Sequence, residues 1–355
     1  MTSSAGRNRL AAIVAAVLVA AVTTGAAACS SPARSPGKAG RTASHLVRKG
    51  LASQAPAARP VVGRLGSYWV GQRMITFVEP AHRGPTQQLG PRRLLTQIRY
   101  PLAGRPKPGT PRAKGQFPLI VFGPGFMQCG GPYSRMLRAW ATAGYVVVVV
   151  NFPHSDCKVG SGATEADMVN QPHDMSYVIT RMLALSAAPH GLFAGLLNKR
   201  EIAVTGQSDG GDTVAAIAAN TCCADHRVAA VAVLSGQEWA RSTCPACQLT
   251  GRYFTRRPMP ILFTQGSADV VNVPATSELM YRADRSRQRY YLDLLGASHT
   301  GPYWGTNPAE RIVVRVTLAF FNRFVLGQDA AGPAIKRAGN VRGLAVLVSG
   351  DQPPP

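Results

Sequence analysis

Acidic residues are scarce in the first half of this sequence. Between Met1 and Ser155 there are 20 Lys and Arg but a single acid, Glu79, whereas the whole 355-residue chain carries 39 basic and 17 acidic residues. Such an excess of positive charge attracts polyanions. No nucleic-acid-binding motif is present, so we expect no nucleic-acid partner. Anionic membrane lipids or cell-wall polymers are the expected polyanions, and a contribution to solubility alone is the alternative.

Long apolar runs are missing as well. The apolar run Leu10–Thr24 is about 15 residues long, short of the roughly 20 that a membrane-spanning helix needs. It follows the basic residues Arg7 and Arg9 and ends in small residues up to Ala28. This pattern is typical of a secretory signal, so we expect an exported protein. A membrane anchor is the alternative.

The seven cysteines fit an exported chain. Cys29 stands where bacterial lipoproteins carry their lipidated cysteine, and simple secretion after Ala28 is the alternative. The other six form an even set, which favours disulfides in an oxidising compartment: Cys129, Cys157, Cys222, Cys223, Cys244 and Cys247. The last four would also suit a four-thiolate zinc site. We favour disulfides and expect no metal, and a Cys129–Cys157 bond is one candidate pairing.

Composition and patterning divide the chain into four parts. Charged residues make up only 16% and hydrophobic residues 46%, which is typical of a folded domain rather than of a disordered chain. We expect a signal peptide over 1–28, a basic flexible linker over 29–65, one folded domain over 66–328 and a tail over 329–355. The linker is predicted from its Ala, Ser, Pro and Gly content and from its lack of hydrophobic periodicity.

Strand-like and helix-like segments alternate through the folded part. Apolar strands that alternate with amphipathic helices indicate the α/β class, with a mostly parallel central sheet covered by helices on both faces. Two early strands are expected at 74–78 and 94–100. Later strands are expected at 118–122, 145–150, 201–205, 229–234, 260–264 and 289–295. Helices are expected at 132–142, 173–185, 210–220, 274–282 and 309–325.

A G-x-S-x-G motif at residues 206–210 joins an apolar strand to a helix of small residues. A sharp turn of this kind projects the serine hydroxyl above the sheet, and the flanking glycines avoid a clash. The start of the following helix directs amides at developing negative charge. Ser208 is therefore the candidate nucleophile, and an ordinary glycine-rich turn is the alternative.

A serine nucleophile needs a base and an acid that orients the base. Two histidines follow Ser208: His226 is too close along the chain to come from a later strand, whereas His299 lies in a loop after the strand at 289–295. Asp269 follows the strand at 260–264 in a glycine-containing turn, where helix capping is the alternative role. Ser208, Asp269 and His299 stand in the order of a catalytic triad on this type of strand–turn–helix scaffold.

Two backbone amides are expected to form an oxyanion hole. One is that of Asp209, directly after the nucleophile, and the other is that of Phe126, in the glycine-rich loop after the strand at 118–122. Trp239, Tyr253 and Phe254 fall in a loop-rich segment and are expected to line an acyl pocket. Packing elsewhere in the molecule is the alternative for these three aromatics.

Four motifs together resemble a known family. G-P-G-F at 123–126, G-Q-S-D-G at 206–210, G-S-A-D at 266–269 and G-A-S-H at 296–299 are similar to the loops of bacterial cutinase-like polyesterases. They also resemble those of dienelactone hydrolase-like and platelet-activating-factor acetylhydrolase-like α/β-hydrolases, over about Gly66 to Leu326. The resemblance implies an α/β-hydrolase fold and ester hydrolysis through an acyl-enzyme, with no metal or organic cofactor.

Two residues depart from that family pattern. Many relatives have a histidine before the nucleophile and an apolar residue after it, where this chain has Gln207 and Asp209. An acid beside the oxyanion site opposes the charge that develops there, which affects rate and substrate preference more than mechanism. Dienelactone hydrolases proper use a cysteine nucleophile, so their activity is not implied by Ser208.

The expected function is therefore that of an exported, monomeric serine hydrolase, either lipidated or freely secreted. Its substrates would be short or medium acyl esters, lipids or polyesters. Acyl transfer to an envelope lipid or glycan is one alternative. A non-catalytic envelope-binding lipoprotein on the same fold is another, although the complete set Ser208, Asp269 and His299 argues against it.

Overall fold

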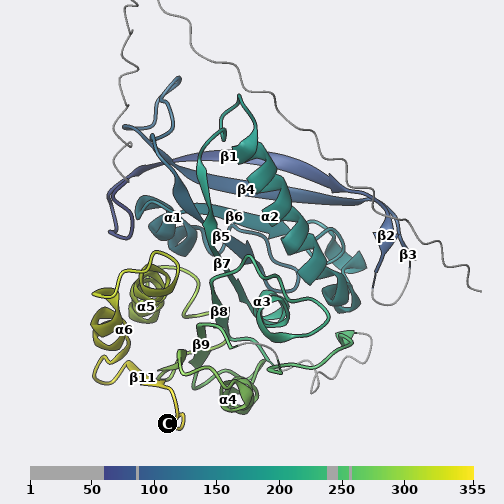
Figure 1. Ribbon diagram of the computed structural model, residues 1–355. Helices are drawn as coiled ribbons and strands as arrows, with labels where there is room; N and C mark the ends of the chain where they lie inside the picture. Colours follow the sequence, from purple (N-terminus) through teal and green to yellow (C-terminus); the bar gives the residue numbers. More distant parts are fainter. Residues whose placement is uncertain (1–59, 85–87, 238–246, 256–257) are drawn as a thin grey trace, which may run out of the picture. The chain divides into compact units, whose positions relative to one another are not determined.

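The computed structural model describes residues 60–84, 88–237, 247–255 and 258–355 (Figure 1). The expected signal segment, most of the expected linker, Cys29 and Trp239 lie outside these described residues. Within the described ranges, none of the helices combines the length and the apolar character needed to cross a bilayer.

A nine-stranded mixed sheet forms the centre of the folded part, in the order β1-β4-β6-β5-β7-β8-β9-β10-β11. The middle strands from β6 to β10 pair in parallel, whereas β1, β4 and β11 pair antiparallel at the edges. This arrangement confirms the predicted α/β class. The strands are β1 (Trp69–Glu79), β4 (Arg92–Leu102), β5 (Phe117–Gly123), β6 (Val146–Asn151), β7 (Leu197–Gln207), β8 (Ala230–Leu234), β9 (Ile261–Gly266), β10 (Arg289–Leu294) and β11 (Ala345–Ser349). A separate pair joins β2 (His82–Arg83) to β3 (Gln88–Leu89).

Helices cover both faces of the sheet. On one face pack α2 (Gln171–Ala187), α3 (Asp209–Ala219) and α4 (Pro274–Ala283), preceded by the short 3-10 helices η1 (Gly160–Gly162) and η2 (Glu165–Asn170). On the other pack α1 (Ser134–Thr142), α5 (Pro308–Phe324) and α6 (Ala331–Gly339). The predicted helices all have counterparts here, with ends that differ by a few residues.

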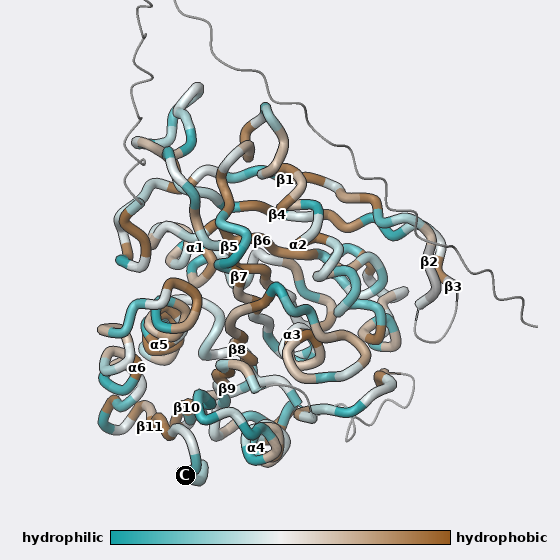
Figure 2. The backbone as a smooth tube through the Cα atoms, viewed as in Figure 1, coloured by the Kyte–Doolittle hydropathy of each residue, from teal (hydrophilic) through white to brown (hydrophobic). Residues whose placement is uncertain are grey.

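Alternation along the strands explains why both faces are covered. In β6, Val146, Val148 and Val150 enter the core under α2 and α3, while Val147 and Val149 enter the core under α1 and α5. All five are fully buried. Because successive side chains of a strand point to opposite faces, a continuous valine run requires an apolar layer on each side. The central strand β8 and the middle of β7 are correspondingly brown in the hydropathy view (Figure 2).

The folded part begins before residue 66, the predicted boundary. Gly63, inside the expected linker, donates its amide to the carbonyl of Ala143 at 2.8 Å and accepts a hydrogen bond from Asn322 Nδ2 at 2.8 Å. Val62 packs against the buried cores on both faces of the sheet. Short apolar residues within a Pro- and Gly-rich stretch carry no periodic signal, which is why the boundary at residue 65 is late.

Residues 329–355 form part of the domain and are not the expected tail. They contain α6, which packs against α5, and β11, which pairs antiparallel with β10. Leu347 is buried at the close contact between β11 and Gly339 of α6. After β11, the hydroxyl of Tyr281 donates to the carbonyls of Gly350 and Gln352, at 2.9 and 3.0 Å. One short apolar run was too weak a signal to predict an edge strand.

We predict that Leu347→Ala lowers the free energy of unfolding by about 2–4 kcal/mol, the usual cost of truncating a buried leucine. Leu344→Ala is the matched control, because Leu344 is 39% exposed and a surface truncation costs about 0.5 kcal/mol or less. Urea denaturation of both variants measures the two costs. Equal and small effects would mean that β11 contributes little to the stability of the domain.

Candidate active site

The turn between β7 and α3 holds Ser208 in an unusual backbone conformation. Its φ is 55° and its ψ is −122°, which an L-residue adopts only under constraint from its surroundings. A Cβ at Gly206 would lie 2.2 Å from the carbonyl oxygen of Gly210, and a Cβ at Gly210 would lie 1.9 Å from that of Gly123. Both positions therefore require glycine, as the motif analysis predicted.

Ser208, His299 and Asp269 come together above the ends of β7, β9 and β10. The Oγ of Ser208 lies 2.9 Å from Nε2 of His299, and Nδ1 of His299 lies 2.8 Å from Oδ2 of Asp269. The structure thus places these three predicted residues in one hydrogen-bonded series. Such a series can withdraw a proton from the serine hydroxyl and stabilise the resulting imidazolium.

Asp269 is held as a carboxylate by several donors. Its Oδ1 accepts the amides of Val271 and Asn272, at 2.9 and 3.0 Å, and its Oδ2 also accepts Gln265 Nε2 at 3.0 Å. Burial alone would raise the pKa of Asp269, but the hydrogen bond from His299 and these amides outweigh it and keep the pKa below its ordinary value. The carboxylate is therefore ionised and oriented toward His299 at neutral pH.

A second set of polar contacts, centred on Gln207, was not predicted from the sequence. The side-chain oxygen of Gln207 accepts the hydroxyl of Tyr133 at 2.7 Å, and its Nε2 lies 3.3 Å from the carbonyl oxygen and 3.2 Å from Nε2 of His299. The hydroxyl of Tyr133 in turn accepts the amide of Gly125 at 3.3 Å. Gln207 thus connects the histidine loop to the glycine-rich loop after β5. Tyr133 belongs to no local motif, so nothing in the sequence indicates this role.

The expected oxyanion-hole loop lies directly against the nucleophile. A Cβ at Gly125 would be 3.1 Å from Cβ of Ser208. Among the described residues, the amides of Phe126 and Asp209 donate to no other residue. Asp209 begins α3, where an amide has no partner within its own helix. The Phe126 amide is consequently available to a bound oxygen, whereas the Asp209 amide also interacts with the carboxyl of its own side chain.

The carboxyl of Asp209 is buried beside this site. It is 7% exposed, and its Oδ2 has no hydrogen-bond partner among the described residues. Burial raises the pKa of Asp209 to about 7, and the negative charge of Glu165 adds to the shift. One turn further along α3, burial and the charge of Asp209 also raise the pKa of Asp212, whose Oδ1 accepts the amide of Gln237 at 2.5 Å. Two acids thus lie next to the place where an oxyanion would form.

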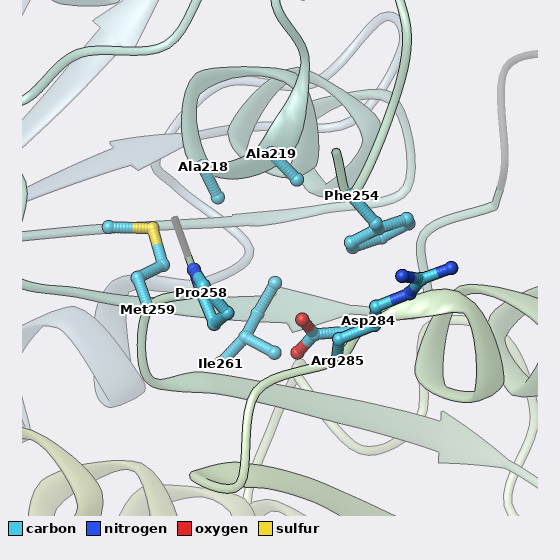
Figure 3. Close-up of a pocket in the computed structure, with 8 residues that line it drawn as sticks. All are labelled: Ala218, Ala219, Phe254, Pro258, Met259, Ile261, Asp284 and Arg285. Carbon is cyan, nitrogen blue, oxygen red and sulfur yellow. The ribbon is translucent and has the colours of Figure 1, made fainter. Parts of the chain in front are cut away.

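The expected acyl-pocket residues are not brought to Ser208. Phe254 donates its amide to the carbonyl of Ala219 at 3.0 Å, and Tyr253 forms a bridge with Asn220. Both therefore lie at the C-terminal end of α3, about 15 Å along the helix from Ser208 at 1.5 Å per residue. Phe254 instead lines a small pocket there, together with Ala218, Ala219, Pro258, Met259, Ile261, Asp284 and Arg285 (Figure 3). A loop's direction cannot be predicted from its composition, so this assignment was wrong for Tyr253 and Phe254.

All five described cysteines, Cys247 among them, are disulfide-bonded. Cys129 is bonded to Cys157, and Cys222 is bonded to its neighbour Cys223. The first bond joins the loop after β5 to the loop after β6, where Met127 also donates its amide to the carbonyl of Ser155 at 2.8 Å. The second removes two thiolates from the alternative zinc site. In the described part of the chain, no three His, Cys, Asp or Glu side chains are grouped as metal ligands.

No family model matches the chain, and no curated protein matches it.

The raised pKa of Asp209 predicts how stability changes with pH. The unfolded state ionises this acid near pH 4, while the folded state keeps it protonated up to about pH 7, so its burial lowers stability progressively between those values. We expect Asp209→Asn to raise the melting temperature by an amount that grows from pH 4 to pH 7 and is constant above pH 7. Thermal denaturation across this range measures it.

Asp225→Asn is the control with the opposite sign. Burial acts to raise the pKa of Asp225, but hydrogen bonds from Arg227 outweigh it and lower the pKa. That substitution should lower the melting temperature at neutral pH, and the loss should shrink as the pH falls through the acidic range. A pH-independent effect of Asp209→Asn would show that Asp209 is already ionised in the folded protein.

Proposed function

We propose that the chain is a serine hydrolase of the α/β-hydrolase type that cleaves carboxylic esters through an acyl-enzyme. The observation that carries the proposal is the hydrogen-bonded series from Ser208 through His299 to Asp269. The order of the sheet supports it, because β7 lies in the middle of the parallel strands. Nucleophile, acid and base then follow from successive strand ends in the order typical of that fold.

In the proposed reaction, Ser208 Oγ attacks the ester carbonyl carbon while its proton passes to Nε2 of His299. The amides of Phe126 and Asp209 donate to the carbonyl oxygen as it gains negative charge. The bond to the alcohol oxygen then breaks, and the alcohol takes the proton from His299. A water molecule, deprotonated by His299, then attacks the acyl-Ser208 ester; the bond to Ser208 Oγ breaks, His299 returns the proton to that oxygen, and the carboxylic acid is released.

Exposed apolar side chains on the loops around Ser208 favour a substrate with an apolar acyl group. Met127, in the oxyanion-hole loop, is 43% exposed, and Val270 and Val271, directly after Asp269, are 86% and 64% exposed. Apolar residues at such exposure leave area that an acyl chain can cover. Esters of short or medium fatty acids, lipids and polyesters all provide that surface.

Acyl transfer to an envelope lipid or glycan is a second proposal with the same first step. It differs only in the acceptor, a hydroxyl group in place of water, so the identity of the product separates the two. A binding function without catalysis is supported only by Asp209, whose charge would oppose an oxyanion above pH 7.

Export is proposed on the sequence of residues 1–29 and is supported by the disulfides. The Cys129–Cys157 and Cys222–Cys223 bonds suit an oxidising compartment. Two forms of the exported protein fit this proposal: one with a lipid on Cys29, and one that is cleaved after Ala28 and freely secreted.

We predict that the full chain hydrolyses p-nitrophenyl butyrate and that Ser208→Ala lowers kcat by a factor of about 10⁴ or more, as loss of a nucleophile does in other serine hydrolases. A fluorophosphonate probe should label the parent protein and not this variant. Ser161→Ala, at an exposed serine of η1, is the matched control and should leave both kcat and fluorophosphonate labelling unchanged. A folded parent protein that neither turns over ester nor reacts with the probe would contradict the proposal and favour the binding function.

The Cys129–Cys157 disulfide is expected to matter for catalysis. Replacing both cysteines with serine frees the loop that carries the Phe126 amide, and displacement of an oxyanion donor costs on the order of 10²-fold in kcat. We therefore expect kcat for p-nitrophenyl butyrate to fall roughly tenfold or more, with a smaller change in KM. The paired variant Cys222→Ser, Cys223→Ser removes the disulfide at the far end of α3 and should leave kcat unchanged. Equal losses in the two variants would point to a general loss of stability.

A further inference from the structure

A surface groove with four arginines runs between α1 and α5, which lie side by side (Figure 1). Its volume is about 350 Å³. Arg135 and Arg138 are three residues apart on α1, and Arg311 and Arg315 are four residues apart on α5, so each pair lies on one face of its helix. The other lining residues are Leu65, Ala139, Thr142, Glu310 and Val314.

The positive charge in this groove is poorly neutralised. Its one acid, Glu310, pairs with Arg135 at 3.1 Å. Arg311 donates to the carbonyl of Thr306 at 3.1 Å, and Arg138 and Arg315 form no ion pair within the described residues. Four exposed guanidinium groups and one buried carboxylate leave a net charge of +3 around one hollow. Like charges at these spacings destabilise a helix slightly, and a bound anion would remove that cost.

The positive charge of the groove also affects a buried arginine next to it. Arg99 of β4 is 5% exposed, and burial together with the charge of Arg138 lowers its pKa to about 10. The positive potential thus extends from the groove into the protein. The charge of Arg138 acts on Arg99 with little screening, because the effective dielectric constant is lower inside the protein than in water.

The walls of the groove are apolar as well as cationic. Ala139 and Val314 line it between the arginines, and Leu65, at its border, is 42% exposed. A small soluble anion needs no apolar wall. A phospholipid headgroup needs both, because its phosphate lies next to glycerol and acyl carbons.

We propose that the α1–α5 groove binds the phosphate-bearing headgroup of an anionic phospholipid, so that this face docks on a membrane surface. Both helices begin near the catalytic candidates: Tyr133, directly before α1, bonds Gln207, and Trp304, just before α5, packs on the ring of Tyr133 at 6.0 Å. Docking would therefore hold the Ser208 edge of the sheet close to the lipid surface. The proposal does not depend on the ester activity.

The test compares vesicles of phosphatidylcholine alone with vesicles that also contain phosphatidylglycerol, using the full chain. The variant Arg138→Gln, Arg315→Gln removes the two arginines without an ion pair and leaves Arg135 on Glu310. Each basic residue near an anionic surface contributes about fivefold in binding. We therefore expect cosedimentation with the anionic vesicles to weaken roughly tenfold or more, and to be recovered by Arg138→Lys, Arg315→Lys.

The matched control is Lys199→Gln, Arg200→Gln. These two exposed basic residues lie near the start of β7, at the opposite end of the strand from Ser208. The control removes the same charge and leaves the eight basic residues of positions 1–59 in place, so background attraction by those residues is equal in both variants. Binding that falls equally in the control and the groove variant would overturn the proposal. So would a groove variant that loses binding to soluble polyphosphate but not to anionic vesicles. Hydrolysis of p-nitrophenyl butyrate, measured in parallel, reports on the ester activity separately.

Discussion

The close approach of three glycine backbones fixes the position of Ser208, and the other parts of the site are arranged around that turn. The backbones at Gly206, Gly210 and Gly123 leave no room for a Cβ between them. Their contact joins the end of β7 and the start of α3 to the end of β5, so the nucleophile candidate and the oxyanion-hole loop are set by the same packing. A larger residue at Gly210 would displace both together, because its Cβ would overlap the Gly123 carbonyl. The strained φ of Ser208 persists because these contacts leave the chain no alternative path.

The triad residues could be predicted from sequence because each lies in a short local pattern at a strand end. Ser208, Asp269 and His299 each follow an apolar strand and stand in a glycine-containing turn. The parallel sheet then brings strand ends together without further information. The Tyr133–Gln207 hydrogen bond joins residues 74 positions apart and depends on where the packing of α1 on the sheet places Tyr133, which no local pattern encodes. For the same reason the direction of the 247–255 segment, and with it the position of Phe254, could not be predicted.

The ends of the fold show a different limit of sequence reasoning. The periodicity of a central strand such as β6 is unmistakable because both faces are buried. β11 is an edge strand of five residues with a mixed burial pattern, and its apolar run is short enough to occur in a loop. Its pairing with β10 is decided by the free edge that β10 presents and by the apolar face of α6. A short apolar run of this kind forms a strand only where another strand, distant in the chain, is available to pair with it.

Charge is distributed differently in the helical layers on the two faces of the sheet, with acids at the start of α3 on one face and arginines on α1 and α5 on the other. At the N-terminus of α3 the helix dipole favours negative charge, and Asp209 and Asp212 lie there without a cationic partner among the described residues. Burial overcomes the dipole and raises the pKa of both acids, so that near and below pH 7 the first turn remains largely available to an oxyanion. The arginines of α1 and α5 are exposed, and their charge is accessible to a surface rather than to a buried transition state. A protonated acid beside the nucleophile is therefore compatible with unpaired guanidinium groups elsewhere on the surface. Protonation of Asp209 limits its repulsion of an oxyanion at Ser208. The arginines attract the protein to an anionic surface without altering the charge at Ser208.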